Sequence, residues 1–67
     1  MLVYCIDVLK ALKDAGYSQN FLLKEGILAS KVLTHIRRSE PISWKTLDTL
    51  CNLLRCQPGD IIEYVDE

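Results

Sequence analysis

The segment from residue 19 to residue 38 reads QNFLLKEGILASKVLTHIRR and decides the fold. Two short stretches with apolar residues at helical spacing flank a tight connection, residues 25–27, that contains a glycine. The first stretch predicts a helix over residues 19–24, and Ser18 is a good N-cap for it. The second predicts a helix that begins near Ala29 or Ser30 and ends near Arg38. A helix, a tight turn and a second helix form a helix-turn-helix unit.

The second of these helices has two complementary faces. Its apolar stripe comprises Ala29, Val32, Leu33 and Ile36, and its polar stripe comprises Lys31, Thr34, His35 and Arg38, with Ser30 at the N-terminal end and Arg37 at the flank. A major groove admits one α-helix, and cationic side chains can address the acceptors of guanine there. The other interpretation of the same pattern is an ordinary amphipathic surface helix with a solvated polar face.

Three further elements are expected around this unit. Apolar spacing predicts a helix over Val3–Ala15 that Gly16 ends in a left-handed conformation. After the break at Pro41, Ser43 caps a helix that runs to about Leu54. A last short helix is expected over residues 60–64, with a strand over residues 61–65 as the alternative because of its β-branched residues. The predicted fold is all-α, with five short helices in one domain over residues 1–67.

At this point the chain resembles the Cro- and phage-repressor-type (Xre-like) helix-turn-helix regulators, in particular their short single-domain bacterial branch. The resemblance covers nearly the whole chain. It rests on Leu9-x-x-Leu12, Gly16-Tyr17-Ser18-Gln19, Leu33-Thr34-x-Ile36-Arg37-Arg38, Pro41-Ile42-Ser43-x-x-x-Leu47 and Leu50-Cys51-x-x-Leu54-x-Cys56-Gln57-Pro58-Gly59-Asp60-Ile61. It implies a lambda-repressor-like DNA-binding domain in which the second and third helices form the helix-turn-helix.

The resemblance also implies roles for individual residues. Gln19 would bind a phosphate and brace the recognition helix. The residues implied to face bases or phosphates in the major groove are Ser30, Lys31, Thr34, His35 and Arg38. Arg37, at the flank of this face, is a further candidate for DNA binding. Phosphate would also be held at the start of the fourth helix by Ser43, Trp44 and Lys45, through backbone N–H groups, the helix dipole and the lysine charge.

The distribution of charge along the chain fits a nucleic-acid partner better than the net charge does. The net charge is −1. Residues 28–46 hold four basic side chains against one acidic side chain, and residues 57–67 hold four acidic side chains and no basic one. Local potential, and not the total charge, steers a phosphate backbone.

Composition argues against several other classes of protein. The three cysteines, Cys5, Cys51 and Cys56, are an odd number at unrelated spacings, which fits reduced thiols in the cytoplasm better than a disulfide framework. With one histidine and no CxxC, no structural metal is expected. No apolar run is long enough for a membrane span, and no signal peptide is expected at the N-terminus. No nucleophile–base signature is present, so we expect no enzyme, no cofactor and no small-molecule substrate.

The predicted function is sequence-specific binding of double-stranded DNA by a bacterial transcription regulator, with repression as the expected outcome. The alternative is a helical protein-interaction module, such as an antitoxin-like protein, without DNA affinity of its own. A homodimer is expected, because two half-sites about 34–36 Å apart are then read together. Apolar residues beyond the needs of the inner core are the expected dimer surface: Leu2, Tyr4, Leu53, Ile62, Tyr64 and Val65.

Overall fold

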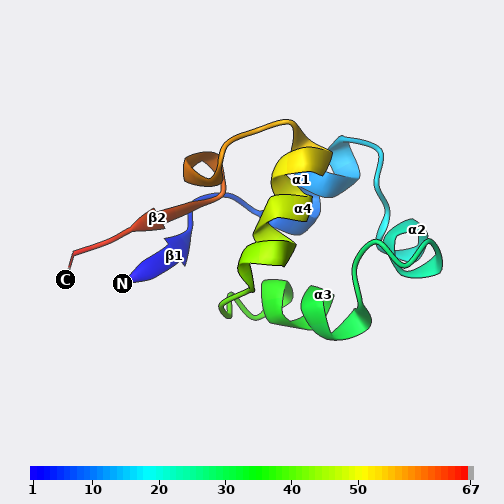
Figure 1. The fold of residues 1–67 in the computed structure, drawn as a ribbon, viewed down its shortest axis with the longest axis horizontal. Coiled ribbons are helices and arrows are strands. Elements are labelled where there is room, and N and C mark those ends of the chain that lie inside the picture. The colour runs from blue at the N-terminus through cyan, green and yellow to red at the C-terminus, as the bar shows by residue number, and fades with distance from the viewer. Residues whose placement is uncertain (67) are drawn as a thin grey trace.

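The computed structural model describes residues 1–66 and shows a small helical bundle with a two-stranded ribbon at one end (Figure 1). Its extents along the principal axes are 38 × 22 × 19 Å, and the ribbon lies at one end of the longest axis. The elements in chain order are β1 (Leu2–Tyr4), α1 (Val8–Asp14), α2 (Gln19–Lys24), α3 (Ser30–Arg37), α4 (Trp44–Leu54), a 3-10 helix η1 (Pro58–Asp60) and β2 (Ile62–Tyr64).

The three central helices agree with the sequence-based expectation. α2 has the predicted bounds, and the Ser18 hydroxyl accepts from the backbone N–H of Phe21 at 3.1 Å. α4 begins directly after Ser43, whose hydroxyl accepts from the backbone N–H of Thr46 at 3.1 Å. Each serine satisfies an N–H group that has no partner within its helix. These caps place the start of α2 and of α4 within one residue of the prediction.

The prediction of a first helix over Val3–Ala15 is wrong at its N-terminal end. α1 begins at Val8, and Asp7 is its N-cap, with its carboxylate accepting from the backbone N–H of Lys10 at 3.2 Å. Residues 2–4 are a strand instead. At the other end Gly16 has φ 97, so the predicted left-handed stop is confirmed.

The expected fifth helix over residues 60–64 is also wrong, and the alternative of a strand is correct. β2 pairs antiparallel with β1 in the register Leu2↔Tyr64, Val3↔Glu63 and Tyr4↔Ile62. The fold is therefore mostly helical with a two-stranded sheet, and not all-α with five helices. The two chain ends, for which helices were expected, instead gain their backbone hydrogen bonds by pairing with each other.

Tyr4 fixes the ribbon to the bundle. Its hydroxyl donates to the backbone carbonyl of Glu40 in the α3–α4 connection at 2.7 Å. Burial raises the pKa of the Tyr4 hydroxyl above its usual value near 10, so the group keeps its proton across the neutral range. The pKa of Tyr4 is higher in the folded protein than in the unfolded chain. The stabilisation by the buried, protonated Tyr4 hydroxyl is therefore complete at neutral pH and is lost only as the pH rises past the ordinary tyrosine pKa.

The core lies where α1, α2, α3 and α4 meet, and the residue before β2 closes it. The buried side chains are Val8, Leu12, Leu22, Leu28, Leu33, Ile36, Leu50 and Ile61. Each of the four α-helices contributes at least one of these buried side chains. The inner face of α3 is therefore held by the core. The positions of the exposed side chains on α3 are therefore set by packing behind the helix.

The start of α3 lacks the side-chain cap that α2 and α4 have. Ala29 occupies the N-cap position with φ −77 and ψ 156, close to the values at Ser43, φ −72 and ψ 160. The side chain of Ala29 is exposed and has no oxygen that could accept a hydrogen bond from a backbone N–H group. Ser30 is the first helical residue, so Ser30 does not supply the cap.

We expect Ala29→Ser to stabilise the protein by about 1 kcal/mol, or about 4–8 °C in the midpoint of thermal unfolding. The backbone at residue 29 already has the geometry in which Ser43 caps α4, so the new hydroxyl needs no rearrangement. Ala29→Val is the control, because it enlarges the side chain without adding an acceptor. Equal midpoints for the serine and valine variants in a melting experiment would show that the cap is not formed.

Candidate nucleic-acid interface

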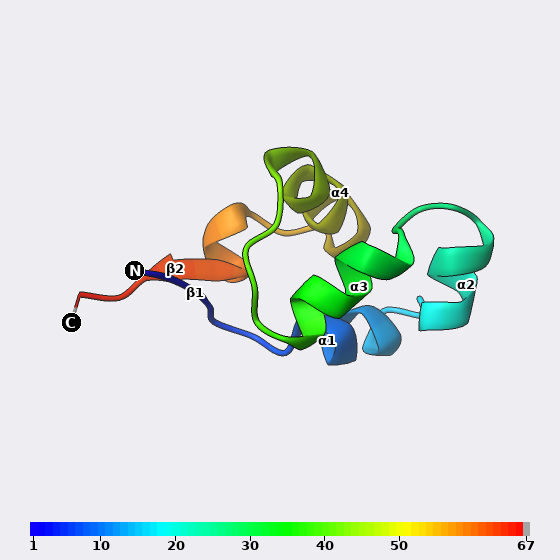
Figure 2. The ribbon, with the colours of Figure 1, turned by 90° about the horizontal axis from the view of Figure 1, so that it is seen from below.

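The outer face of α3 is exposed at its two ends and half-buried in the middle. In Figure 2, α3 lies between α4 above it and α1 below it, and α2 lies beyond the right-hand end of α3. Leu33 and Ile36 point into the core and are buried, whereas Lys31 and Arg38 are exposed. The helix thus presents cationic side chains at both ends of this face.

The remaining residues predicted for this face differ in exposure. Ser30 is exposed, and Thr34 and His35 are half-buried. The Thr34 hydroxyl donates to the backbone carbonyl of Ser30 at 3.1 Å, one turn back along the helix. That bond uses the hydroxyl proton, so Thr34 can present its methyl group and its oxygen lone pairs but no donor.

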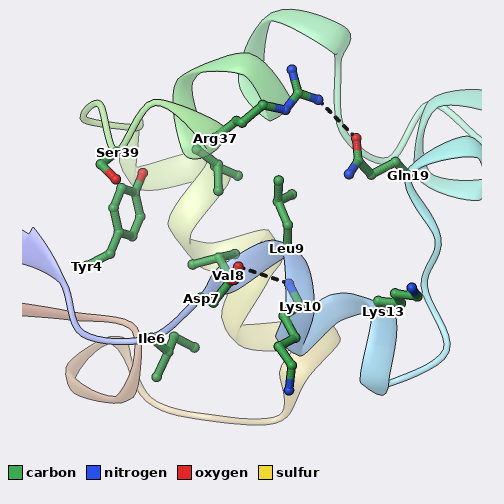
Figure 3. A pocket seen from close by; sticks show the side chains of 11 residues that line it. Tyr4, Ile6, Asp7, Val8, Leu9, Lys10, Lys13, Gln19, Arg37 and Ser39 are labelled. Atoms are coloured by element: carbon green, nitrogen blue, oxygen red, sulfur yellow. Dashed lines mark hydrogen bonds between the residues drawn. The ribbon is translucent and has the colours of Figure 1, made fainter.

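Arg37 faces the neighbouring helix. Its Nη2 donates to Oε1 of Gln19 at 3.1 Å, which joins the last turn of α3 to the first residue of α2 (Figure 3). Both side chains are exposed and line a pocket of about 810 Å³ together with the start of α1. The hydrogen bond holds the amide of Gln19 and the guanidinium of Arg37 side by side, so that an anion at this edge would meet donors from two helices.

The start of α4 forms the other edge of the surface. Trp44 and Lys45 are exposed, and 91% of Trp44 is accessible. The Ser43 hydroxyl caps the helix and also donates to Oγ1 of Thr46 at 3.0 Å. Its proton is therefore already used, which leaves the backbone N–H groups of the first turn, the indole N–H of Trp44 and the ammonium of Lys45 as the donors at this end.

A comparison with protein families agrees with this geometry. A family model described as the Cro/C1-type helix-turn-helix (HTH) DNA-binding domain matches residues 8–67. The chain belongs to this family. A search of curated proteins and a search of solved structures found no match. Membership of a DNA-binding family makes DNA the expected partner of the Cro/C1-type domain, and the structure shows which side chains lie on the exposed face of its helix-turn-helix.

One basic residue near this face was not singled out by any sequence motif. Lys13, in the last turn of α1, lines the same pocket as Gln19 and Arg37, and it also lines a second pocket with Ser18 and Gln19. The sequence signal that could have identified Lys13 is its position three residues before Gly16, where the chain turns toward α2. Lys10 lines the first pocket too, but its ammonium points away from Arg37 (Figure 3) and pairs with Asp14 at 3.6 Å.

Two other features are absent from the described residues. Within residues 1–66, no three histidine, cysteine, aspartate or glutamate side chains come together as metal ligands would. In the same range, no helix has both the length and the apolar character to cross a bilayer.

Proposed function

We propose that the Cro/C1-type domain is a sequence-specific transcription regulator that inserts α3 into the major groove and represses by occupying its operator. The observation that carries this proposal is the orientation of α3. Leu33 and Ile36 are locked in the core, which leaves Lys31 and Arg38 in the open. A helix held in this way can enter a groove without losing any of its internal packing.

The contacts proposed for the interface divide into two kinds. Side chains on the outer face of α3 would read base edges: Ser30, Lys31, Thr34, His35 and Arg38. Side chains at its two edges would hold phosphates and set the register of the helix: Gln19, Arg37, Ser43, Trp44 and Lys45. The Ser43 hydroxyl is engaged with Thr46, so Ser43 would not bind a phosphate through its hydroxyl. It would act by capping α4 and so fixing the start of that helix. Phosphate contacts position a protein on the duplex, whereas base contacts give specificity.

Salt dependence is the first test, since random duplex DNA needs no knowledge of the operator. Four cations, Lys31, Arg37, Arg38 and Lys45, lie on the proposed face. Each phosphate contact contributes about −0.9 to the slope of log affinity against log salt, so we expect a slope of about −3 to −4 per domain. Lys45→Ala should make the slope about one unit less steep without changing sequence preference. Absence of binding at low salt would favour a protein-interaction module instead.

We also propose that the domain binds as a homodimer through the ribbon end. Leu2 and Tyr64 lie opposite each other in the sheet and are 68% and 70% exposed. Of the other expected dimer residues, Val65 is exposed, while Tyr4, Leu53 and Ile62 are half-buried against the core. Exposed apolar side chains clustered on one part of a small protein mark interaction surfaces. Because a second copy carries the same patch, contact between the two patches would bury Leu2 and Tyr64 of both copies at once.

Leu2→Glu combined with Tyr64→Glu should convert a complex of two protomers per operator into a weaker complex of one. The two carboxylates would face the equivalent pair on the other copy, where like charges repel. Native mass spectrometry of the operator complex counts the protomers. Leu23→Glu on α2 is the matched control, because Leu23 is also an exposed leucine but lies on α2, away from the ribbon. One wild-type protomer per operator would contradict the dimer proposal.

A further inference from the structure

The C-terminal end of α4 brings two cysteines together. Arg55 follows the helix in the left-handed conformation, with φ 55 and ψ 50, and turns the chain back on itself. The backbone N–H of Cys56 therefore donates to the carbonyl of Cys51 at 3.1 Å, across five positions of sequence. This is the long hydrogen bond of a Schellman motif, in which the side chains of the two bonded residues commonly touch.

The thiols share one environment. Both cysteines are half-buried and free, and both line an open groove of about 320 Å³ along the outer face of α4. Burial raises the pKa of Cys56, and the neighbouring Cys51 thiol raises it further. With the N–O distance of 3.1 Å, standard backbone dimensions keep the two Cα atoms within about 7 Å, near the upper limit for a disulfide.

We propose that Cys51 and Cys56 form a dithiol site that low-molecular-weight disulfides such as oxidised glutathione convert into an intramolecular disulfide. The Cys51 thiolate attacks the small disulfide, forms a mixed disulfide and releases one small thiol. The Cys56 thiol then loses its proton to solvent and attacks the Cys51 sulfur, releasing the second small thiol. Two electrons pass from the protein to the small disulfide, which is reduced to two thiols.

Assigning the first attack to Cys51 follows from the surroundings of Cys56. A raised pKa leaves little thiolate at neutral pH, and the thiolate is the nucleophile. Cys56 can still complete the reaction, because the Schellman turn holds it beside the mixed disulfide. The third cysteine has a partner of its own, since the Cys5 thiol follows β1 and donates to the backbone carbonyl of Gly59 at 3.7 Å.

The two thiols lie at the end of α4 that is away from the proposed DNA-binding face, and the groove that they line extends along α4 to Trp44. α4 starts beside α3 with Trp44 and ends on the opposite side of the molecule, where the chain turns toward η1 (Figure 1). Oxidation would join the end of α4 to the segment that leads to Ile61, a buried member of the core. A covalent bond there constrains the unfolded chain more than the folded one, so the folded protein should favour the disulfide.

The test is thiol–disulfide equilibrium of the full chain with reduced and oxidised glutathione, followed by alkylation and mass spectrometry. The expected product has lost two hydrogens, carries one alkyl group on Cys5 and gives a peptide that links Cys51 to Cys56. Cys5→Ser is the matched control and should lose two hydrogens with no alkylation. Cys56→Ser should stop at a mixed disulfide between Cys51 and glutathione.

The same equilibrium measured in concentrated urea separates the role of the fold from that of chain proximity. We expect the intramolecular disulfide to form at least about tenfold more favourably in the folded protein than in urea, because folding holds the thiols together. An equal or smaller equilibrium constant in the folded protein would overturn the proposal. So would persistent mixed disulfides on both cysteines of the wild-type chain, or a link through Cys5.

Discussion

Replacing Lys31 and Arg38 together by alanine should lower the affinity for the operator by at least about 30-fold, because each well-placed cationic contact in the groove contributes about 1–3 kcal/mol. Both side chains are exposed on α3 and contribute nothing to the core, so the midpoint of thermal unfolding should stay within about 3 °C of wild type. An operator selected from random oligonucleotides supplies the duplex, and a fluorescence anisotropy titration measures the affinity.

Lys10→Ala is the matched control for this loss. It also removes a positive charge from an exposed helix, but the Lys10 ammonium pairs with Asp14 and points away from Arg37. The control should bind within about threefold of wild type, since the Lys10 charge is paired and is not among the proposed DNA contacts. If the double variant and the control bind alike, α3 does not carry the interface and the proposed function fails.

Leu50→Ala should destabilise the domain by about 2–5 kcal/mol, the range found when a fully buried leucine is truncated. Leu50 has no exposed surface and lies on α4, which packs against α1. A 67-residue chain has little stability in reserve, because small domains bury a smaller share of their surface. We therefore expect most of this variant to be unfolded at 37 °C, as measured by circular dichroism and chemical denaturation.

Leu53→Ala is the matched control for Leu50→Ala. It shows how much of the destabilisation comes from the loss of buried packing and how much from replacing any leucine of α4. Leu53 is on the same helix but is only half-buried against the core. Its truncation should cost clearly less than that of Leu50, at about 1 kcal/mol, because part of the side chain is already in water. Equal destabilisation of the two variants would show that the core is not centred where the structure places it.

The helices were predictable wherever the signals were local. A capping serine lies directly before α2 and before α4, and Gly16 ends α1 as expected. These signals act within a few residues, so a sequence pattern can reveal them. Asp7 carried the same kind of signal, since aspartate is a good N-cap, but apolar residues that continue in front of it suggested a longer helix.

The ribbon could not be predicted with the same certainty, because neither strand is stable alone. Residues 2–4 obtain their partner from residues 62–64, at the other end of the chain. Strand propensity depends strongly on such neighbours, so the β-branched residues near Ile62 left helix and strand both open. The contact between Tyr4 and the carbonyl of Glu40 has no sequence signal at all.

The residues of the interface were easier to propose than their individual roles. The two faces of α3 follow from the spacing of Leu33 and Ile36, and both side chains are buried as expected. The bonds that consume the hydroxyl protons of Thr34 and Ser43 depend on local geometry that no pattern specifies. Lys13 is brought beside Gln19 by the turn between α1 and α2, which a linear spacing rule does not describe.

The ribbon also has a consequence for the order of events during protein synthesis. Residues separated by 64 positions meet at its tip, where the terminal ammonium of Met1 donates to the carbonyl of Val65. A ribosome makes β2 after every helix of the bundle, so a nascent chain has the recognition helix long before it has the patch formed by Leu2 and Tyr64. Pairing of two copies through that patch must therefore wait until translation of the domain is complete.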